Sequence, residues 1–395
     1  MTASAPLPDL AVIGAGTMGA WTALRARRAG WSTLLIDAFG AGHPRATSGD
    51  ETRICRAAHG ADTFYVGWAR EARQAWIEFG EEVGERLYVE CGMAWFAHRE
   101  DGFEAHSIAS LTSLGVPIER IAADVAARRW PGLRTDDLAF VAFEPEAGLL
   151  FARRGIAAVA RAFAAAGGRF ELAGVRPGRA DGRRLLDVVA TDGTRHAAGT
   201  FVFAAGPWLP QLFPDLLGGR ISVTKQDVLF LGPAAGDGRF NAEWLPCWVD
   251  SDLDAYGLPA VDGRGMKIAP DRAGPPFDPS DGDRLVDPES VRLVRAYAAR
   301  RFPDLATAPV VETRVCQYEE TADTHFILDR HPDHDNVWIA GGGSGHGFKH
   351  GPVIGSHLVS RLAGAPASPE EGRFSLSHER VRAANLRLGG GASPT

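Results

Sequence analysis

Three glycines near the start of the chain, Gly14, Gly16 and Gly19, constrain the fold more than any other feature. They follow residues 10–13, a short apolar run of strand length, and precede residues 20–28, which have the composition of a helix. In this setting the glycines permit a tight turn, close approach of the backbone to a pyrophosphate, and close packing of helix on strand. The helix N-terminus then faces the phosphates. The segment therefore predicts a Rossmann-type dinucleotide site.

A second strand is expected at residues 33–36, and Asp37 ends it. A carboxylate at this place can accept hydrogen bonds from ribose hydroxyls and repels the 2′-phosphate of NADP. Thr17 and Met18 lie inside the glycine turn and are expected to face the cofactor with it. The turn alone does not distinguish FAD from NAD.

Composition excludes several classes of function. The net charge of -7 argues against binding nucleic acid or an anionic membrane surface. No window approaches the ~20 apolar residues of a membrane span, and the N-terminus lacks the pattern of a secretory signal. The four cysteines show no C-x-x-C spacing, so no metal site is expected. We therefore expect a soluble cytoplasmic protein, active as a monomer, with reduced thiols.

The chain is long enough for two large cores, with 395 residues of which 45% are hydrophobic. Nucleotide-type strand and helix signals occur at both ends, whereas residues 221–269 alternate apolar and polar residues as in an antiparallel sheet. The pattern predicts a mixed α/β (α+β) chain. Its dinucleotide-binding domain is discontinuous, with residues 1–82, 145–220 and 310–395, and its substrate domain, with a mostly antiparallel sheet, takes residues 83–144 and 221–309. A helix is expected to begin after Asp287, a good N-cap, and the tail at 389–395 is expected to fray.

Four blocks carry a more specific resemblance: Gly14 to Gly19 with Asp37; Thr52-Arg53-Ile54-Cys55-Arg56; Val315-Cys316-Gln317-Tyr318 with Asp323-Thr324-His325-Phe326; and Ser344 to Lys349. With them, the sequence resembles the D-amino-acid-oxidase-like superfamily of FAD enzymes, and within it the monomeric sarcosine oxidase and N-methyltryptophan oxidase family. The similarity runs from Leu10 to about Leu362. The resemblance implies FAD as the cofactor and a Rossmann-type FAD-binding domain.

The resemblance also implies which residues hold the FAD. It implies a thioether link between Cys316 and the flavin ring, where the alternative is an ordinary core cysteine. The small residues of the late loop allow backbone to lie against a planar ring, and the helix that follows stabilises negative charge there. A segment Gly-x-Trp is expected near the flavin, and the backbone of Val175 near the adenine. The further cofactor residues implied are Gly206, Trp208, Gly343, Gly345, His346, Gly347 and Lys349.

For the substrate, the resemblance implies that Arg56 and Lys349 bind a carboxylate, because an unpaired buried carboxylate is costly. It places Arg53 close to the flavin face, where it is a catalytic candidate. If the run around the two arginines is helical, both side chains point to one face. Lys267 matches a lysine that promotes the reaction with oxygen, since a positive charge favours superoxide formation, and Tyr256 matches a catalytic and substrate-pocket tyrosine.

Two departures from the family pattern concern the substrate pocket. Monomeric sarcosine oxidases carry a histidine-rich stretch where this chain has Ser48-Gly49-Asp50-Glu51, and a histidine where it has Pro270-Asp271. The residues on the flavin side persist while those of the pocket change. We infer shared chemistry with an altered substrate, so that a bulkier secondary amine or a cyclic imino acid fits as well as sarcosine.

Three functional hypotheses follow. The first is an FAD-dependent oxidase of a secondary amine or an N-methyl or cyclic amino acid, in which hydride transfer to flavin N5 gives an imine and O2 reoxidises the flavin to yield hydrogen peroxide. The second is a flavin amine dehydrogenase that passes electrons to a protein or quinone. The third, of a different class, is an NAD-dependent dehydrogenase or a non-catalytic dinucleotide-binding module, which explains the opening glycines but nothing after residue 300.

Overall fold

The opening glycine turn joins a parallel strand to a helix, as the sequence predicted. In the computed structural model, which describes residues 7–381, β1 (Leu10–Ile13) pairs in parallel with β2 (Thr33–Asp37) and β15 (Thr200–Phe203). Helix α1 (Thr17–Arg28) begins directly after the turn. The predicted strand, turn, helix and strand are therefore confirmed, whereas the tail at 389–395 lies outside the described residues.

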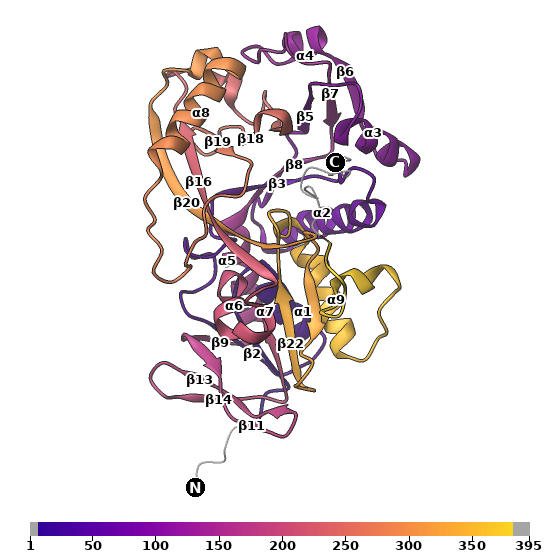
Figure 1. Ribbon diagram of the computed structural model, residues 1–395, viewed down its shortest axis with the longest axis vertical. Coiled ribbons are helices and arrows are strands. Elements are labelled where there is room, and N and C mark those ends of the chain that lie inside the picture. Colours follow the sequence, from indigo (N-terminus) through magenta and orange to yellow (C-terminus); the bar gives the residue numbers. More distant parts are fainter. Residues whose placement is uncertain (1–6, 382–395) are drawn as a thin grey trace.

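This unit belongs to a six-stranded sheet in the lower half of Figure 1. Alternate residues of β1 enter different cores: Leu10 and Val12 pack with α1 and α9, and Ala11 and Ile13 pack on the opposite face. The strand is apolar throughout because both faces of the sheet are covered. The strand order is β21 (Ile327–Arg330), β22 (Val337–Gly341), β15, β1, β2 and β9 (Arg169–Leu172).

An eight-stranded sheet forms the second large unit. Its neighbouring strands are antiparallel except for β17 and β5, which pair in parallel, so the prediction of a mostly antiparallel sheet is confirmed. The order is β20 (Val310–Thr321), β16 (Ile221–Leu231), β19 (Met266–Pro270), β18 (Ala255–Leu258), β17 (Cys247–Asp250), β5 (Met93–Ala97), β7 (Phe140–Glu144) and β6 (Glu119–Ala122). Helix α8 (Pro288–Arg301) covers one face, and Asp287 caps it as predicted by accepting from the backbone N–H of Glu289 at 2.8 Å.

The smaller sheets connect and flank these two units. One consists of β3 (Thr52–Cys55), β8 (Gly148–Phe151) and β4 (Tyr88–Val89), a second of β10 (Val175–Pro177), β13 (Asp187–Ala190) and β14 (Arg195–Ala197), and a third of β11 (Ala180–Asp181) and β12 (Arg184–Leu185). The remaining helices are α2 (Thr63–Val83), α3 (Phe103–Ser113), α4 (Ala123–Arg129), α5 (Ala152–Ala165), α6 (Leu209–Leu212), α7 (Pro214–Leu217) and α9 (Gly351–Leu362). None of the helices among residues 7–381 has the length and apolar character needed to cross a bilayer.

The six-stranded sheet draws its strands from both ends and the middle of the chain, so the predicted discontinuous cofactor domain is confirmed. The long pair β16 and β20 runs between the upper and lower halves of the molecule (Figure 1), with register from Ile221 opposite Thr321 to Leu231 opposite Val310. Strand β20 thus belongs to the eight-stranded sheet, although it lies within residues 310–395, the third predicted segment of the cofactor domain. The domain boundaries themselves stay a prediction.

Candidate active site

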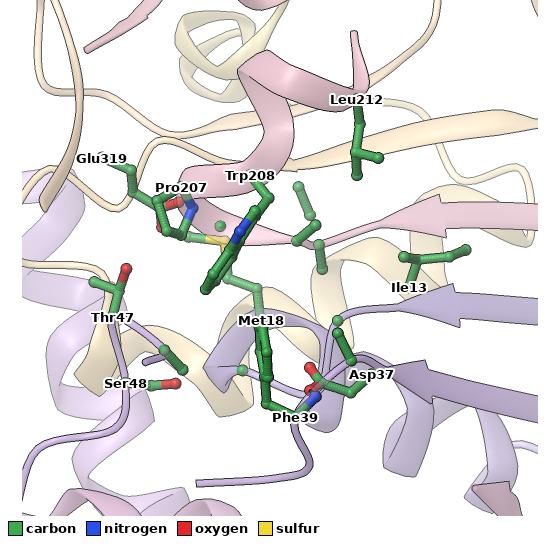
Figure 2. A pocket seen from close by; sticks show the side chains of 18 of the residues that line it. Ile13, Met18, Asp37, Phe39, Thr47, Ser48, Pro207, Trp208, Leu212 and Glu319 are labelled. Carbon is green, nitrogen blue, oxygen red and sulfur yellow. Dashed lines mark hydrogen bonds between the residues drawn. The ribbon is translucent and has the colours of Figure 1, made fainter. Parts of the chain in front are cut away.

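The opening glycine turn lines a cavity of about 360 Å³. Segments far apart in the sequence converge on this cavity, including the strand ends at Asp37 and Val175, the turn at Gly206 and the late glycine loop. Figure 2 shows Met18, Phe39 and Trp208 around it, with Glu319 beside the turn that contains Pro207. The predicted cofactor residues that line it are Gly14, Gly16, Thr17, Met18, Asp37, Val175, Gly206, Trp208, Gly343, Gly345 and Gly347. Gly19, Cys316, His346 and Lys349 do not line it.

Two glycines of the first turn are required by space. A Cβ on Gly14 would lie 2.3 Å from the carbonyl oxygen of Ala204, and the residue has a φ of +105°. A Cβ on Gly19 would lie 1.9 Å from the carbonyl oxygen of Gly14, so this glycine permits the helix to pack against the turn. Helix α1 has Gly16 as its N-cap, with no capping side chain and no acidic residue in its first turn. Its first N–H groups are therefore available to an anion in the cavity.

Asp37 supports the turn from the end of β2. One carboxylate oxygen accepts from the N–H of Ala15 at 2.7 Å, and the other accepts from the N–H groups of Phe39 and Gly40, each at 2.8 Å. The carboxylate also lines the cavity. These hydrogen bonds hold the loop after β2 against the glycine turn.

The late glycine loop faces the same cavity. Gly347 lies so close to Gly343 that a Cβ on it would be 2.9 Å from the neighbouring Cα, and Gly345 has a φ of +71°. The hydroxyl of Thr17 donates to the carbonyl of Phe348 at 3.0 Å, which ties the early turn to the late loop. The two glycine-rich segments thus form one cradle in which backbone, not side chains, meets a ligand.

Cys316 lies next to this cradle on β20. Its side chain is buried, and its Sγ accepts from Nη2 of Arg53 at 3.3 Å. Arg53 and the strand neighbour Tyr318 do line the cavity. The thiol therefore lies within one side-chain layer of the cavity and beside a permanent positive charge.

The run around the two arginines is not helical, so the condition under which both would point to one face is not met. Residues 52–55 form strand β3, paired with β8 in an antiparallel ladder. Arg53 lies on β3 and points toward Cys316, whereas Arg56 follows the strand and lies over the ring of Trp95, 5.0 Å from its centroid. The two arginines serve different parts of the site.

A buried carboxylate that the sequence analysis did not identify joins two predicted catalytic residues. Asp50 accepts from Arg53 at 2.6 Å and forms an ion pair with Lys267, and all three side chains are largely buried. Lys267 also donates to the carbonyl of Thr52 at 3.1 Å. Burial opposes ionisation of Asp50, but the charges of Lys267 and Arg53 outweigh it and hold the pKa of this carboxyl well below its usual range.

Tyr256 lies beside this cluster. Its ring centroid is 5.8 Å from Nζ of Lys267, and it packs with Cys316 and Phe230. Burial raises the pKa of Tyr256 well above its ordinary value, so the phenol stays protonated. The structure therefore brings together three predicted catalytic residues, Arg53, Lys267 and Tyr256.

The two predicted carboxylate-binding cations meet in another part of the site. Lys349 is 2% exposed and Arg56 is 8% exposed. The ammonium of Lys349 donates to the carbonyl of His346 at 3.1 Å, and among residues 7–381 no carboxylate lies within ion-pair distance of it. Burial lowers the pKa of Lys349 strongly, and the charge of Arg56 lowers it further. An anion placed between the two cations would relieve this repulsion.

Glu144 forms the wall behind Arg56. Its carboxylate accepts from the N–H groups of Ala57 and Ala58 at 2.7 and 3.1 Å and from the indole of Trp95 at 2.8 Å. Burial raises its pKa, although these hydrogen bonds and Arg56 act in the opposite direction. This carboxylate is committed to orienting the segment that carries Arg56.

Glu319 is a second carboxyl that the sequence analysis missed. It lines the main cavity, is 6% exposed, and its Oε2 has no hydrogen-bond partner among the described residues. Burial raises the pKa of Glu319 to about 7. The sequence held one signal for each of these two acids, because Asp50 precedes the Thr-Arg block and Glu319 follows the Cys-x-Tyr block. Neither pattern reveals, however, that the side chain points inward.

Comparisons with known proteins agree with this geometry. A family model described as DAO, FAD dependent oxidoreductase, matches residues 9–361. A monomeric sarcosine oxidase from Streptomyces avermitilis is 32% identical over 375 residues, which cover 92% of this chain and 96% of that protein. A monomeric sarcosine oxidase from Bacillus sp. (strain B-0618) is 30% identical over 360 residues, covering 90% and 92%. The crystal structure of L-proline dehydrogenase from P. horikoshii has the same fold, with a TM-score of 0.83 at 20% identity over 93% of this chain and 96% of that one.

Proposed function

The chain belongs to the DAO family of FAD-dependent oxidoreductases and acts on CH–NH bonds, and from this premise we propose that its substrate is a secondary amine bearing one carboxylate and that O2 is the electron acceptor. The observation that carries the proposal is the pair of buried cations Arg56 and Lys349, which come from segments almost three hundred residues apart in the sequence. Sarcosine and N-methyltryptophan, the substrates named for relatives, are both amines of this class.

The residues around the main cavity fit FAD. The glycine cradle presents backbone to the cavity, the open N-terminus of α1 suits a pyrophosphate, and the partnerless oxygen of Glu319 offers a hydrogen-bond site to a polar cofactor group. When bound, FAD supplies the acceptor for the hydride and its two electrons. The family model is one of FAD-dependent enzymes, so the NAD-binding alternative is not retained.

Covalent attachment of the flavin at Cys316 is part of the proposal. The thiolate, not the thiol, is the reactive form of cysteine. Nη2 of Arg53 lies 3.3 Å from Sγ, and Asp50 fixes that guanidinium from the other side. Cys55, which lies on β3 near both arginines, is less suited, because burial raises its pKa to about 12.

The amine has to bind in its neutral form for a hydride to leave the adjacent carbon. Asp50 is a poor proton acceptor, because Lys267 and Arg53 hold its pKa low. Glu144 is engaged by two backbone N–H groups and an indole. Neither of these two carboxylates is therefore suited to act as the base, and positioning of the substrate by its carboxylate contributes to the rate.

The role of Lys267 in the oxygen reaction follows from its charge. An ammonium close to the reduced cofactor favours superoxide formation. However, Asp50 forms an ion pair with Lys267 and compensates part of that charge. This single observation favours the second candidate, an amine dehydrogenase that passes its electrons to a protein or quinone.

The first experiment is an absorption spectrum of the purified protein followed by acid precipitation, on the wild type and on Cys316→Ala. A yellow wild-type pellet and a white variant pellet are expected, and a yellow wild-type supernatant would contradict covalent attachment. A peroxide-coupled screen of N-methyl and cyclic amino acids follows. Fast dye reduction with slow oxygen uptake would replace the oxidase by the dehydrogenase.

The carboxylate requirement has a separate test with Lys349→Met. Loss of a charged hydrogen-bonding group should raise KM for an N-methyl amino acid about 10- to 100-fold. The substitution should leave KM nearly unchanged for the matching substrate in which an uncharged carboxamide replaces the carboxylate. Equal effects on acid and amide would remove Lys349 from the substrate site.

The names of the two monomeric relatives also support the proposal that this chain works as a monomer. We keep the cytoplasmic location as a proposal as well. Size-exclusion chromatography with light scattering and cell fractionation test the two statements, and a dimer or a membrane-bound fraction would contradict them.

A further inference from the structure

Three buried histidines outside the main cavity form a cluster that the proposed reaction does not use. His59 follows β3, His346 precedes the short helical turn Phe348–His350, and His350 ends that turn just before α9. Their side chains are at most 6% exposed. We call His59, His346 and His350 the histidine triad, and we propose that it binds a transition-metal ion. The cysteine spacing in the sequence gave no reason to expect a metal, and His59 is nearly three hundred residues from the other two histidines.

The ring positions suit a three-coordinate imidazole site. The ring centroids are 5.8, 5.8 and 6.0 Å apart, and one nitrogen from each ring lies within 4.8 Å of the other two. The centre of such a nearly equilateral triangle is about 3.4 Å from each centroid. A metal at about 2.1 Å from a ring nitrogen lies about 3.2 Å from the ring centroid. The spacing of the three rings therefore matches that of three imidazoles around one ion.

Two of the three rings already have the hydrogen bonds that metal-binding histidines require. Nδ1 of His59 is 2.8 Å from the carbonyl of Ala57, and Nε2 of His346 is 3.0 Å from the carbonyl of Thr324. A carbonyl only accepts, so each of these nitrogens carries the proton and the other nitrogen has a free lone pair. Backbone carbonyls orient metal-binding histidines in this way.

The lone-pair nitrogens have no competing partner. Among the described residues, Nε2 of His59 and Nδ1 of His346 make no hydrogen bond. Neither nitrogen of His350 makes a hydrogen bond of standard geometry, although the backbone of Trp68 lies beside that ring. Buried polar atoms normally have partners, so three such rings facing one another indicate a missing ligand.

The surroundings determine which metal fits. Aromatic rings enclose the triad: the Tyr65 ring centroid is 5.1 to 5.7 Å from all three, and Phe326 stacks on His346 at 4.8 Å. Imidazole ligands without sulfur suit zinc and copper. Burial disfavours the charged imidazolium, with Lys349 and Arg56 acting in the same direction. The same two cations repel a bound ion, which favours singly charged copper over Zn²⁺.

A bound ion would have a structural consequence for the proposed carboxylate site. Lys349 lies in sequence between two triad residues and donates to the carbonyl of one of them, His346. Cross-linking the segment after β3 to the turn before α9 would fix Lys349 relative to Arg56. The metal itself takes part in no electron transfer in this proposal, which does not depend on the identity of the amine.

The test is metal binding by the purified flavoprotein. We expect about one equivalent of copper or zinc per chain by mass spectrometry, either as purified or after titration with Zn²⁺ or with Cu⁺ under reducing conditions. His59→Phe and His350→Phe keep an aromatic ring in place and should each bind at least 100-fold more weakly. His331→Phe, which removes a buried histidine outside the triad, should bind as the wild type does.

Two results would overturn the proposal. One is a wild-type protein that takes up neither ion at micromolar concentration, and the other is binding that survives both triad substitutions. If a variant does not fold, as judged by its flavin spectrum, X-ray absorption on the metal-loaded wild type decides. Three nitrogen ligands support the triad, and a shell containing sulfur or only oxygen contradicts it.

Discussion

The ion cluster of Arg53, Asp50 and Lys267 offers the sharpest test of the energetics of the site. In Asp50→Asn the side chain keeps its size, but two buried cations lose their shared counter-ion. Side-chain exposure is 17% for Arg53, 3% for Asp50 and 2% for Lys267, so hydration cannot stabilise the two cations in place of the lost carboxylate. The change therefore leaves uncompensated charge in the interior, one of the costliest perturbations that a single substitution makes.

The expected loss of unfolding free energy is about 3–5 kcal/mol. The unfolding entropy of a 395-residue chain is about 0.8 kcal/mol/K at ~2.1 cal/mol/K per residue. A loss of about 4 kcal/mol then lowers Tm by about 5 °C. Burial already lowers the pKa of Lys267, and Asp50 opposes this, so the variant can recover part of the loss by deprotonating the lysine as pH rises.

Differential scanning fluorimetry of the purified variant between pH 5 and 8 measures this effect. Asp262→Asn is the control, because it removes a carboxylate that pairs with Arg154 at 2.6 Å on the surface, with 46% of that side chain exposed; it should lower stability by less than about 1 kcal/mol. The double variant Asp50→Asn/Lys267→Met should be less destabilised than the two single effects added together. A Tm for Asp50→Asn within 1 °C of the wild type would refute the reasoning.

The same cluster makes a prediction about acid. Lys267 and Arg53 depress the pKa of Asp50 below the 3.8 of an ordinary aspartate. A depressed folded-state pKa means that the contribution is fully present above pH 3.8 and is lost only as pH falls below it. The stability difference between wild type and Asp50→Asn should therefore stay constant from pH 5 upward, apart from the deprotonation of Lys267, and shrink below about pH 4.

Three further predictions concern other parts of the site. Glu319→Gln should stabilise the FAD-free protein by up to about 3 kcal/mol at pH 8 and by little at pH 5, because burial raises the pKa of Glu319 from 4.5 to about 7 and ionisation of the buried carboxyl costs more as pH rises through this window. Urea unfolding at both pH values measures the difference in stability, and equal effects at the two pH values would contradict the prediction. Gly14→Ala should abolish flavin incorporation, since its Cβ would lie 2.3 Å from the carbonyl after β15, whereas Gly30→Ala, with a similar φ of +94° and open space, should retain the flavin colour at a cost of about 1 kcal/mol. Trp76→Phe removes the indole donor to the carbonyl of Lys349 at 2.9 Å, so it should lower stability by about 1–3 kcal/mol and raise KM for an N-methyl amino acid more than it changes kcat.

The fold was largely predictable because its signals are local. The run at 10–13, the glycine turn and the strand that ends at Asp37 each have a period or a spacing that only one local structure satisfies. Alternation at residues 221–269 predicted antiparallel strands for the same reason. The segment at 52–56 failed this test: its five residues are too short to show a period, and pairing with β8 makes it a strand.

The candidate site was predictable only in part. The glycines, Cys316 and the pair Arg56 and Lys349 were recognised by the blocks that contain them, and Lys267 by its match to a lysine of the family. The structure places most of the glycines around one cavity and the two buried cations in another part of the site. Asp50 and Glu319 were missed, because an acid reads as a surface residue until its burial is known.

By itself the sequence determined the kind of cofactor domain and located the glycine-rich turns that line the cavity, since turns and strands depend on neighbours in the chain. Only the tertiary structure decided that Asp50 compensates the charge of Lys267, that Arg53 contacts Cys316 while Arg56 lies over Trp95, and that His59 meets His346 and His350. These facts depend on burial and on contacts between residues hundreds of positions apart. The interaction energy of a charge, and the cost of leaving a lone pair without a partner, change several-fold with the surroundings of the group. Those surroundings exist only once the chain has folded.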